Sequence, residues 1–95
     1  MRLELSRLAQ GDLDDIRDHS VAEFGTARAI AYLGAIEDAF RRILSFPDIG
    51  AVHPILRPSI RSLGCQQHRI FYQVGSDRIL VVRILHKAMD VERHL

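Results

Sequence analysis

The chain has 95 residues, is 47% hydrophobic and 26% charged, and has a formal net charge of +1. One domain spanning residues 1–95 is expected, and this composition argues against an intrinsically disordered protein. The single cysteine excludes an internal disulfide framework and fits a reducing cytoplasm, while no apolar run approaches the roughly 20 residues of a membrane span and the start lacks a signal-peptide layout.

The first half of the chain predicts a short strand followed by two helices. Leu3–Leu5 alternates apolar and acidic residues, as a strand does. Apolar residues then recur at helical spacing over about Arg7–Phe24, and Gly25 is typical of a helix C-terminus. Thr26 is expected to cap a second helix, which Pro47 ends. The two helices should form a helical hairpin.

The second half predicts three strands, preceded by an irregular loop over Asp48–Pro58 that contains one glycine and two prolines. The strands are expected at about Ile60–Leu63, Gln67–Val74 and Arg78–Leu85. Gly75-Ser76-Asp77 should form the hairpin loop between the last two strands. The last strand is apolar on both faces apart from Arg83, so it is expected to be the central strand.

This element order, β-α-α-β-β-β, defines the expected fold class. It predicts an α+β domain in which the helical hairpin packs on one face of a mostly antiparallel sheet.

The charges are distributed unevenly along the chain. Residues 1–50 hold six arginines and nine acidic residues, whereas residues 51–95 hold six arginines, one lysine and three acidic residues. Four of the five histidines also lie in the second half. A basic C-terminal half suits an acidic partner, either nucleic acid or an acidic protein segment.

Ionisable residues crowd the end of the chain directly after the last strand. They are His86, Lys87, Asp90, Arg93 and His94. A rigid strand that ends in such a cluster is a common scaffold for a site. His86 is either a proton donor and acceptor or a structural residue that ties the strand end to the tail through Asp90, and the second interpretation is favoured.

Three arginines of the predicted sheet are further candidates. Arg83 interrupts an apolar strand, so it either contacts a partner on the exposed sheet face or forms an internal ion pair with an acidic helix residue. Arg61 and Arg69 lie on neighbouring strands and, together with Arg83, would form a basic patch if all three lined one face; otherwise they are solvated edge charges. The histidine spacing lacks a metal-binding signature, and Cys65 has no CxxC partner.

The final segment, RILH-x-x-MD-x-x-RHL, resembles the end of ParE-type toxins in the RelE/ParE toxin–antitoxin superfamily. Further matches follow in order along the chain. They are LS-x-x-A-x-x-DL-x-x-I from Leu5, Phe24-Gly25, Phe46-Pro47, Arg61-Ser62-Leu63, and H-x-IFY-x-V from His68. The resemblance implies the α+β fold predicted above and the toxin component of a type II toxin–antitoxin pair.

A ParE-like toxin would inhibit DNA gyrase by protein–protein binding, without catalysis or a cofactor. The resemblance also implies a hetero-oligomer with a cognate ribbon-helix-helix, ParD-like antitoxin, and the complex would contact operator DNA only through that antitoxin. It further implies a role in plasmid stabilisation. The candidate partner-binding residues are Arg61, Arg69, Arg83, His86, Asp90, Arg93 and His94.

The alternative is a RelE-like, ribosome-dependent mRNA endoribonuclease. Such members of the superfamily usually carry several basic residues and a tyrosine after the last strand, for acid–base chemistry and transition-state charge. Here no tyrosine follows the strand, Asp90 would oppose a phosphate, and the nearest aromatic hydroxyl is Tyr72 in mid-strand. A nuclease would have to use Arg61, Arg69 and His86. An inactive relative that only binds an antitoxin is a third possibility.

Overall fold

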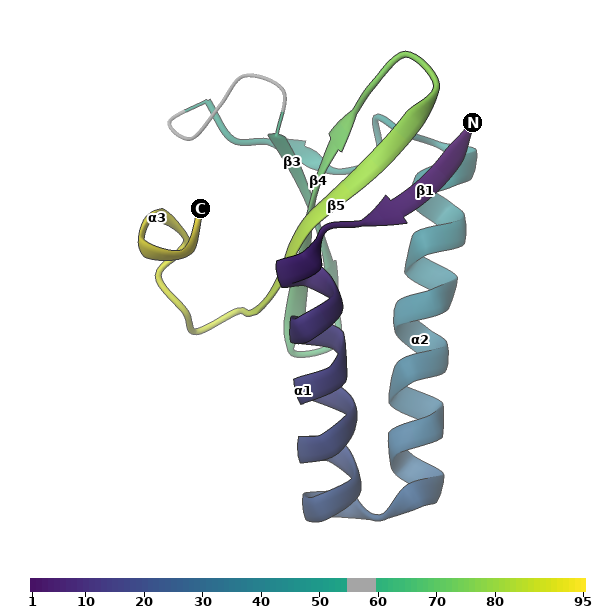
Figure 1. The fold of residues 1–95 in the computed structure, drawn as a ribbon, viewed down its shortest axis with the longest axis vertical. Helices are drawn as coiled ribbons and strands as arrows, with labels where there is room; N and C mark the ends of the chain where they lie inside the picture. The colour runs from purple at the N-terminus through teal and green to yellow at the C-terminus, as the bar shows by residue number, and fades with distance from the viewer. Residues whose placement is uncertain (55–59) are drawn as a thin grey trace.

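Two long helices run side by side and lie against a sheet (Figure 1). The computed structural model describes residues 1–54 and 60–95. The helices are α1 (Arg7–Phe24) and α2 (Thr26–Ser45), and a short helix α3 (Val91–His94) ends the chain. The strands are β1 (Arg2–Leu5), β2 (Ala51–Val52), β3 (Ile60–Cys65), β4 (His68–Val74) and β5 (Arg78–His86). The predicted α+β class and helical hairpin are therefore confirmed.

The five strands form one mixed sheet in the order β1-β5-β4-β3-β2. β1 pairs with β5 in parallel, and the other three pairs are antiparallel. β5 is an interior strand, but the middle position belongs to β4, so the prediction of a central last strand was wrong in that detail. The loop expected from Asp48 to Pro58 contains β2, which was not predicted, and residues 55–58 of that loop lie outside the described residues.

Local side-chain chemistry explains where α1 begins. The Ser6 hydroxyl accepts a hydrogen bond from the Ala9 amide (3.0 Å) and donates one to the Val82 carbonyl (2.7 Å). One residue therefore caps the helix and continues the contact between β1 and β5. α1 ends at Gly25, whose φ of 85° suits glycine. α2 begins at Thr26 without a side-chain cap, so the expected Thr26 cap was wrong.

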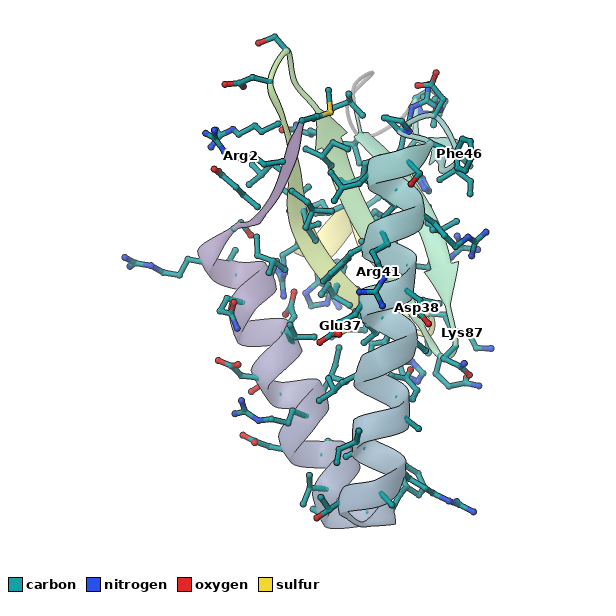
Figure 2. All side chains as sticks on the ribbon, turned by 90° about the vertical axis from the view of Figure 1, so that its right-hand side faces the viewer. Arg2, Glu37, Asp38, Arg41, Phe46 and Lys87 are labelled. Carbon is teal, nitrogen blue, oxygen red and sulfur yellow. The ribbon has the colours of Figure 1, made fainter. Side chains whose placement is uncertain are left out.

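The sheet is buried on both faces by two unequal clusters. On the hairpin side, the apolar stripe of α2 packs on the sheet through residues that include Ile36, Ile43, Ile70, Tyr72, Ile79 and Val81. On the outer side, Ile60, Phe71 and Leu85 form a smaller cluster with Val82 and with Val91 of the C-terminal helix. Figure 1 shows α3 standing apart from the hairpin. The middle of α2 carries exposed charged residues, and Figure 2 shows Glu37, Asp38 and Arg41 there.

A bulge in β5 changes which residues face each side. Tyr72 pairs with Val81 and Phe71 pairs with Arg83, so Val82 is an extra residue. Without the bulge, Arg83 would follow Val81 onto the hairpin side, because strand side chains alternate. The bulge instead places Arg83 on the side of Phe71, beyond the point where β1 stops pairing with β5.

Candidate functional site

Arg83 is held inside the protein by an acidic residue of α1. Its Nε and one terminal nitrogen each donate to the Asp12 carboxylate at 2.8 Å, and the side chains are only 16% and 14% exposed. The same carboxylate accepts a hydrogen bond from the Ile84 amide at 2.9 Å. The hydrogen bonds from Arg83 to Asp12 raise the pKa of Arg83 above its usual value. The internal ion pair, one of the two interpretations of Arg83, is therefore the one that the structure shows.

The same arginine also fixes the tail. The remaining guanidinium nitrogen of Arg83 donates to the His94 carbonyl at 3.2 Å. Asp90 caps α3 by accepting a hydrogen bond from the Glu92 amide at 3.1 Å, while Arg93 is exposed. These contacts engage the Arg83 guanidinium, one oxygen of the Asp90 carboxylate and the backbone carbonyl of His94; the contact of His94 does not involve its imidazole.

Arg61 and Arg69 do not share a face of the sheet. Arg69 pairs with Gly64, three residues from Arg61 on β3, so the side chains of Arg61 and Arg69 point to opposite sides. Arg61 lies on the hairpin side, where it donates to the Gly50 carbonyl at 2.9 Å and to the Asp48 carbonyl at 3.2 Å. The basic patch expected from Arg61, Arg69 and Arg83 is therefore absent from this sheet.

Arg69 belongs to a polar group on the outer face that the sequence did not reveal. Its guanidinium donates to the Ser62 hydroxyl at 3.3 Å, and His53 Nε2 lies 2.6 Å from the same oxygen. Ser62 is only 2% exposed, so this group is a hydrogen-bonded part of the sheet. No spacing between residues 53, 62 and 69 marks it in the sequence, since it depends on the pairing of β2, β3 and β4.

His86 stands at the open end of β5, next to a second histidine on β4. The His86 and His68 rings pack edge to face, with their centroids 5.4 Å apart. His86 Nδ1 accepts a hydrogen bond from the Ala88 amide at 3.1 Å, so the tie between strand end and tail uses Ala88 rather than the expected Asp90. His86 itself is exposed.

His68 joins the strand end to α2. Its Nδ1 lies 2.6 Å from the Tyr32 hydroxyl, which also accepts a hydrogen bond from the Gln67 amide at 3.1 Å. Burial, and next the neighbouring His86, lower the pKa of His68 below its ordinary value. Burial raises the pKa of Tyr32. A protonated Tyr32 donating to a neutral His68 satisfies both groups.

The hydroxyl of Tyr72 is also committed to the fold. It accepts from the Gly50 amide at 2.8 Å and donates to the Pro47 carbonyl at 2.7 Å. Tyr72 is fully buried, and a Cβ atom added at Gly50 would lie 2.6 Å from its oxygen. Tyr72 therefore holds the loop after α2 and is not available as an acid or base.

The described residues hold one cysteine and no cluster suited to a metal ion. Cys65 is a free, partly buried cysteine, and burial raises the pKa of its thiol, which disfavours the reactive thiolate. Among residues 1–54 and 60–95, no group of three or more His, Cys, Asp or Glu side chains is placed to hold a metal ion. Within the same residues, no helix is both long and apolar enough to cross a membrane.

The sequence and the structure of this chain both resemble those of known proteins. Residues 3–91 match the family described as the ParE toxin of the type II toxin–antitoxin system, parDE. The chain belongs to the ParE toxin family. It is 39% identical to Toxin ParE1 of Mycobacterium tuberculosis over 95 residues, which cover 99% of this chain and 97% of that protein. The suspected resemblance is thereby confirmed.

Two further relatives of this ParE-family chain support the assignment. Toxin ParE1 of Caulobacter vibrioides is 34% identical over 91 residues, covering 96% of this chain and 94% of that protein. A solved structure titled as the chromosomal ParDE system from P. aeruginosa superposes with a TM-score of 0.77 at 27% identity, covering 90% of this chain and 95% of that one. The chain is thus a ParE-type toxin of a type II toxin–antitoxin system.

Proposed function

We propose that this ParE-type toxin inhibits DNA gyrase by protein–protein binding, without catalysing a reaction of its own. The observation that supports the proposal is that a partly buried cation of the last strand and the nearest aromatic hydroxyl are both used to hold the fold. Arg83 is paired with Asp12, and the Tyr72 hydroxyl is hydrogen bonded on both sides. Phosphoryl chemistry needs acid, base and cationic groups that converge on one open site.

The alternative nuclease set lacks that convergence. Arg61 and Arg69 lie on opposite faces of the sheet, and Arg61 is bonded to the carbonyls of Asp48 and Gly50. His86 is exposed, but its Nδ1 already accepts from the Ala88 amide. The geometry therefore favours binding over mRNA cleavage.

The proposal includes the toxin's natural partner and compartment. A cognate ParD-like, ribbon-helix-helix antitoxin would neutralise this chain in a hetero-oligomer in the cytoplasm, and operator DNA would be contacted through the antitoxin. The basic C-terminal half suits an acidic antitoxin segment that folds on binding. Exposed basic residues without an ion pair in the described structure, such as Arg69 and Arg93, are candidates for these contacts.

Pulse labelling after induced expression without antitoxin tests the target. We expect DNA synthesis to stop before protein synthesis, and the purified chain to inhibit supercoiling by gyrase. An early collapse of translation with cleaved mRNA would instead establish the nuclease function. Full growth, with antitoxin binding retained, would identify an inactive relative.

A further inference from the structure

A pocket lies between the end of the helical hairpin and the turn that joins β3 to β4. Its volume is about 370 Å³, and its lining includes Phe24, Arg28, Tyr32 and Gln66. Ligand sites of this size are typically mostly apolar, with a few polar groups that fix orientation. None of the partner-binding candidates recognised in the sequence lines this pocket, so it is a separate site.

The pocket carries one positive charge that the described structure leaves without a counter-charge. Arg28 lies over the ring of Phe24, with its guanidinium carbon 6.0 Å from the ring centroid. In residues 1–54 and 60–95, Arg28 forms no ion pair, and the first turn of α2 holds no acidic residue. A cation in the first turn also adds to the positive end of the helix dipole. The charge of the pocket therefore suits a carboxylate.

The opposite wall of the pocket is a strained and firmly held turn. Gln66 has a φ of 56° and is the one residue other than glycine with a positive φ in the described chain. A long side chain adopts this backbone conformation at a cost, and such strain is concentrated at ligand sites and turns. Gln67 holds the turn by donating its amide to the Tyr32 hydroxyl and accepting from the Lys87 amide at 2.9 Å. The backbone of the turn is thus held in place, and the side chains of Gln66 and Gln67 line the pocket.

The apolar surface continues beyond the pocket. Val21 of α1 is not part of the pocket lining but is 42% exposed, and it lies about one helical turn before the pocket-lining Phe24, which is itself 57% exposed. A small metabolite would fill the pocket and leave this rim in water, whereas a protein segment would cover both. The rim therefore favours a macromolecular occupant.

The geometry points to a docking site here for a protein partner's segment in which a bulky apolar side chain is followed by an acidic one. The apolar side chain enters the pocket beside Phe24, and the carboxylate pairs with Arg28. Gln66 is placed to donate a further hydrogen bond from its carboxamide. This site does not depend on gyrase being the target, since it concerns only what binds at the hairpin tip.

Two blocked dipeptides of the same shape test this site on the full chain in solution. Acetyl-leucyl-glutamyl amide carries the carboxylate, and acetyl-leucyl-glutaminyl amide is its neutral match. In a titration followed by amide NMR, we expect the acidic peptide to shift Ala31, Gln66 and Gln67 and to bind at least about threefold more tightly at low salt, where charge pairing is least screened.

Matched variants show whether Arg28 causes the preference. Arg28→Gln should abolish the difference between the two peptides, while Lys87→Gln, at an exposed cation outside the pocket, should preserve it. Both side chains are exposed, so both variants should fold. Equal binding of the two peptides, a preference that survives Arg28→Gln, or shifts confined to other surfaces would overturn the site. Binding of free 3-methylbutanoate as tightly as the acidic peptide would overturn its assignment to a protein segment.

Discussion

Replacing Asp12 by alanine should destabilise this toxin more than any other single loss of a carboxylate described here. The Asp12 carboxylate accepts two hydrogen bonds from Arg83 and one from the Ile84 amide. Its loss leaves a guanidinium that is only 16% exposed without its counter-charge. Removing one partner of a buried pair typically costs about 3–5 kcal/mol, a large part of the roughly 5–15 kcal/mol that stabilises a small domain.

The assay is urea unfolding followed by circular dichroism, supported by thermal melts. A loss of 3 kcal/mol corresponds to a fall of at least about 12 °C in Tm for a domain of this size. The matched control is Asp18→Ala on the same helix. Asp18 pairs with Arg17 at 3.2 Å but is 72% exposed, so its loss should change the free energy of unfolding by less than about 1 kcal/mol.

A double variant separates the lost charge pairing from lost packing. Asp12→Ala combined with Arg83→Met removes both charges and keeps most of the buried volume, so it should recover part of the stability lost in Asp12→Ala alone. If Asp12→Ala costs no more than Asp18→Ala, the ion pair does not anchor α1 to β5 and the reasoning fails.

Three further predictions follow from the other contacts. Tyr72→Phe should lower the free energy of unfolding by about 1–3 kcal/mol in urea titrations, because it leaves the buried Gly50 amide without its acceptor; an unchanged midpoint would remove Tyr72 from its structural role. Burial lowers the pKa of His68 in the folded chain, whereas His68 in the unfolded chain keeps its ordinary pKa of about 6.5. The unfolded chain therefore binds more protons as the pH drops from 7 to 5, and the stability of the fold should decrease over this range. His68→Gln should flatten that decrease in thermal melts, and an equal decrease in both proteins would assign it to other groups. Deleting residues 91–95 removes a four-residue helix that contributes only Val91 to the outer cluster and the His94 carbonyl to Arg83. The chain should therefore stay folded and bind antitoxin while inhibiting gyrase less. Circular dichroism, antitoxin pull-down and a supercoiling assay would check this, and loss of folding would make the tail structural.

The helices and the main strands were predictable because their signals are local. Apolar residues recur along α2 with the helical period, and Gly25 and Pro47 mark its limits. β2 has two residues, too few to show an alternating pattern. The shortest elements therefore depend on pairing that a sequence pattern does not record.

The candidate site was less predictable because it depends on register. An internal partner for Arg83 was foreseen, but four aspartates of α1 were equally plausible until the bulge at Val82 selected Asp12. A shared face for Arg61 and Arg69 was one of two open interpretations, because the two residues lie on adjacent strands. Their separation follows from the β3–β4 pairing, and a shift of one residue in such a register moves every side chain to the other face.

The parallel pairing of the first strand with the last has a consequence for synthesis on the ribosome. Ser6, at the start of α1, reaches its partner Val82 across 76 residues, so this part of the sheet cannot close until nearly all of the chain has emerged. The contacts between α1 and α2 join residues closer in sequence, so the helical hairpin can form much earlier, with its apolar stripe still uncovered. A newly made toxin therefore passes through an interval in which it is incomplete and exposes apolar surface. A partner already present in the cell can meet the chain in that interval, before the finished toxin exists.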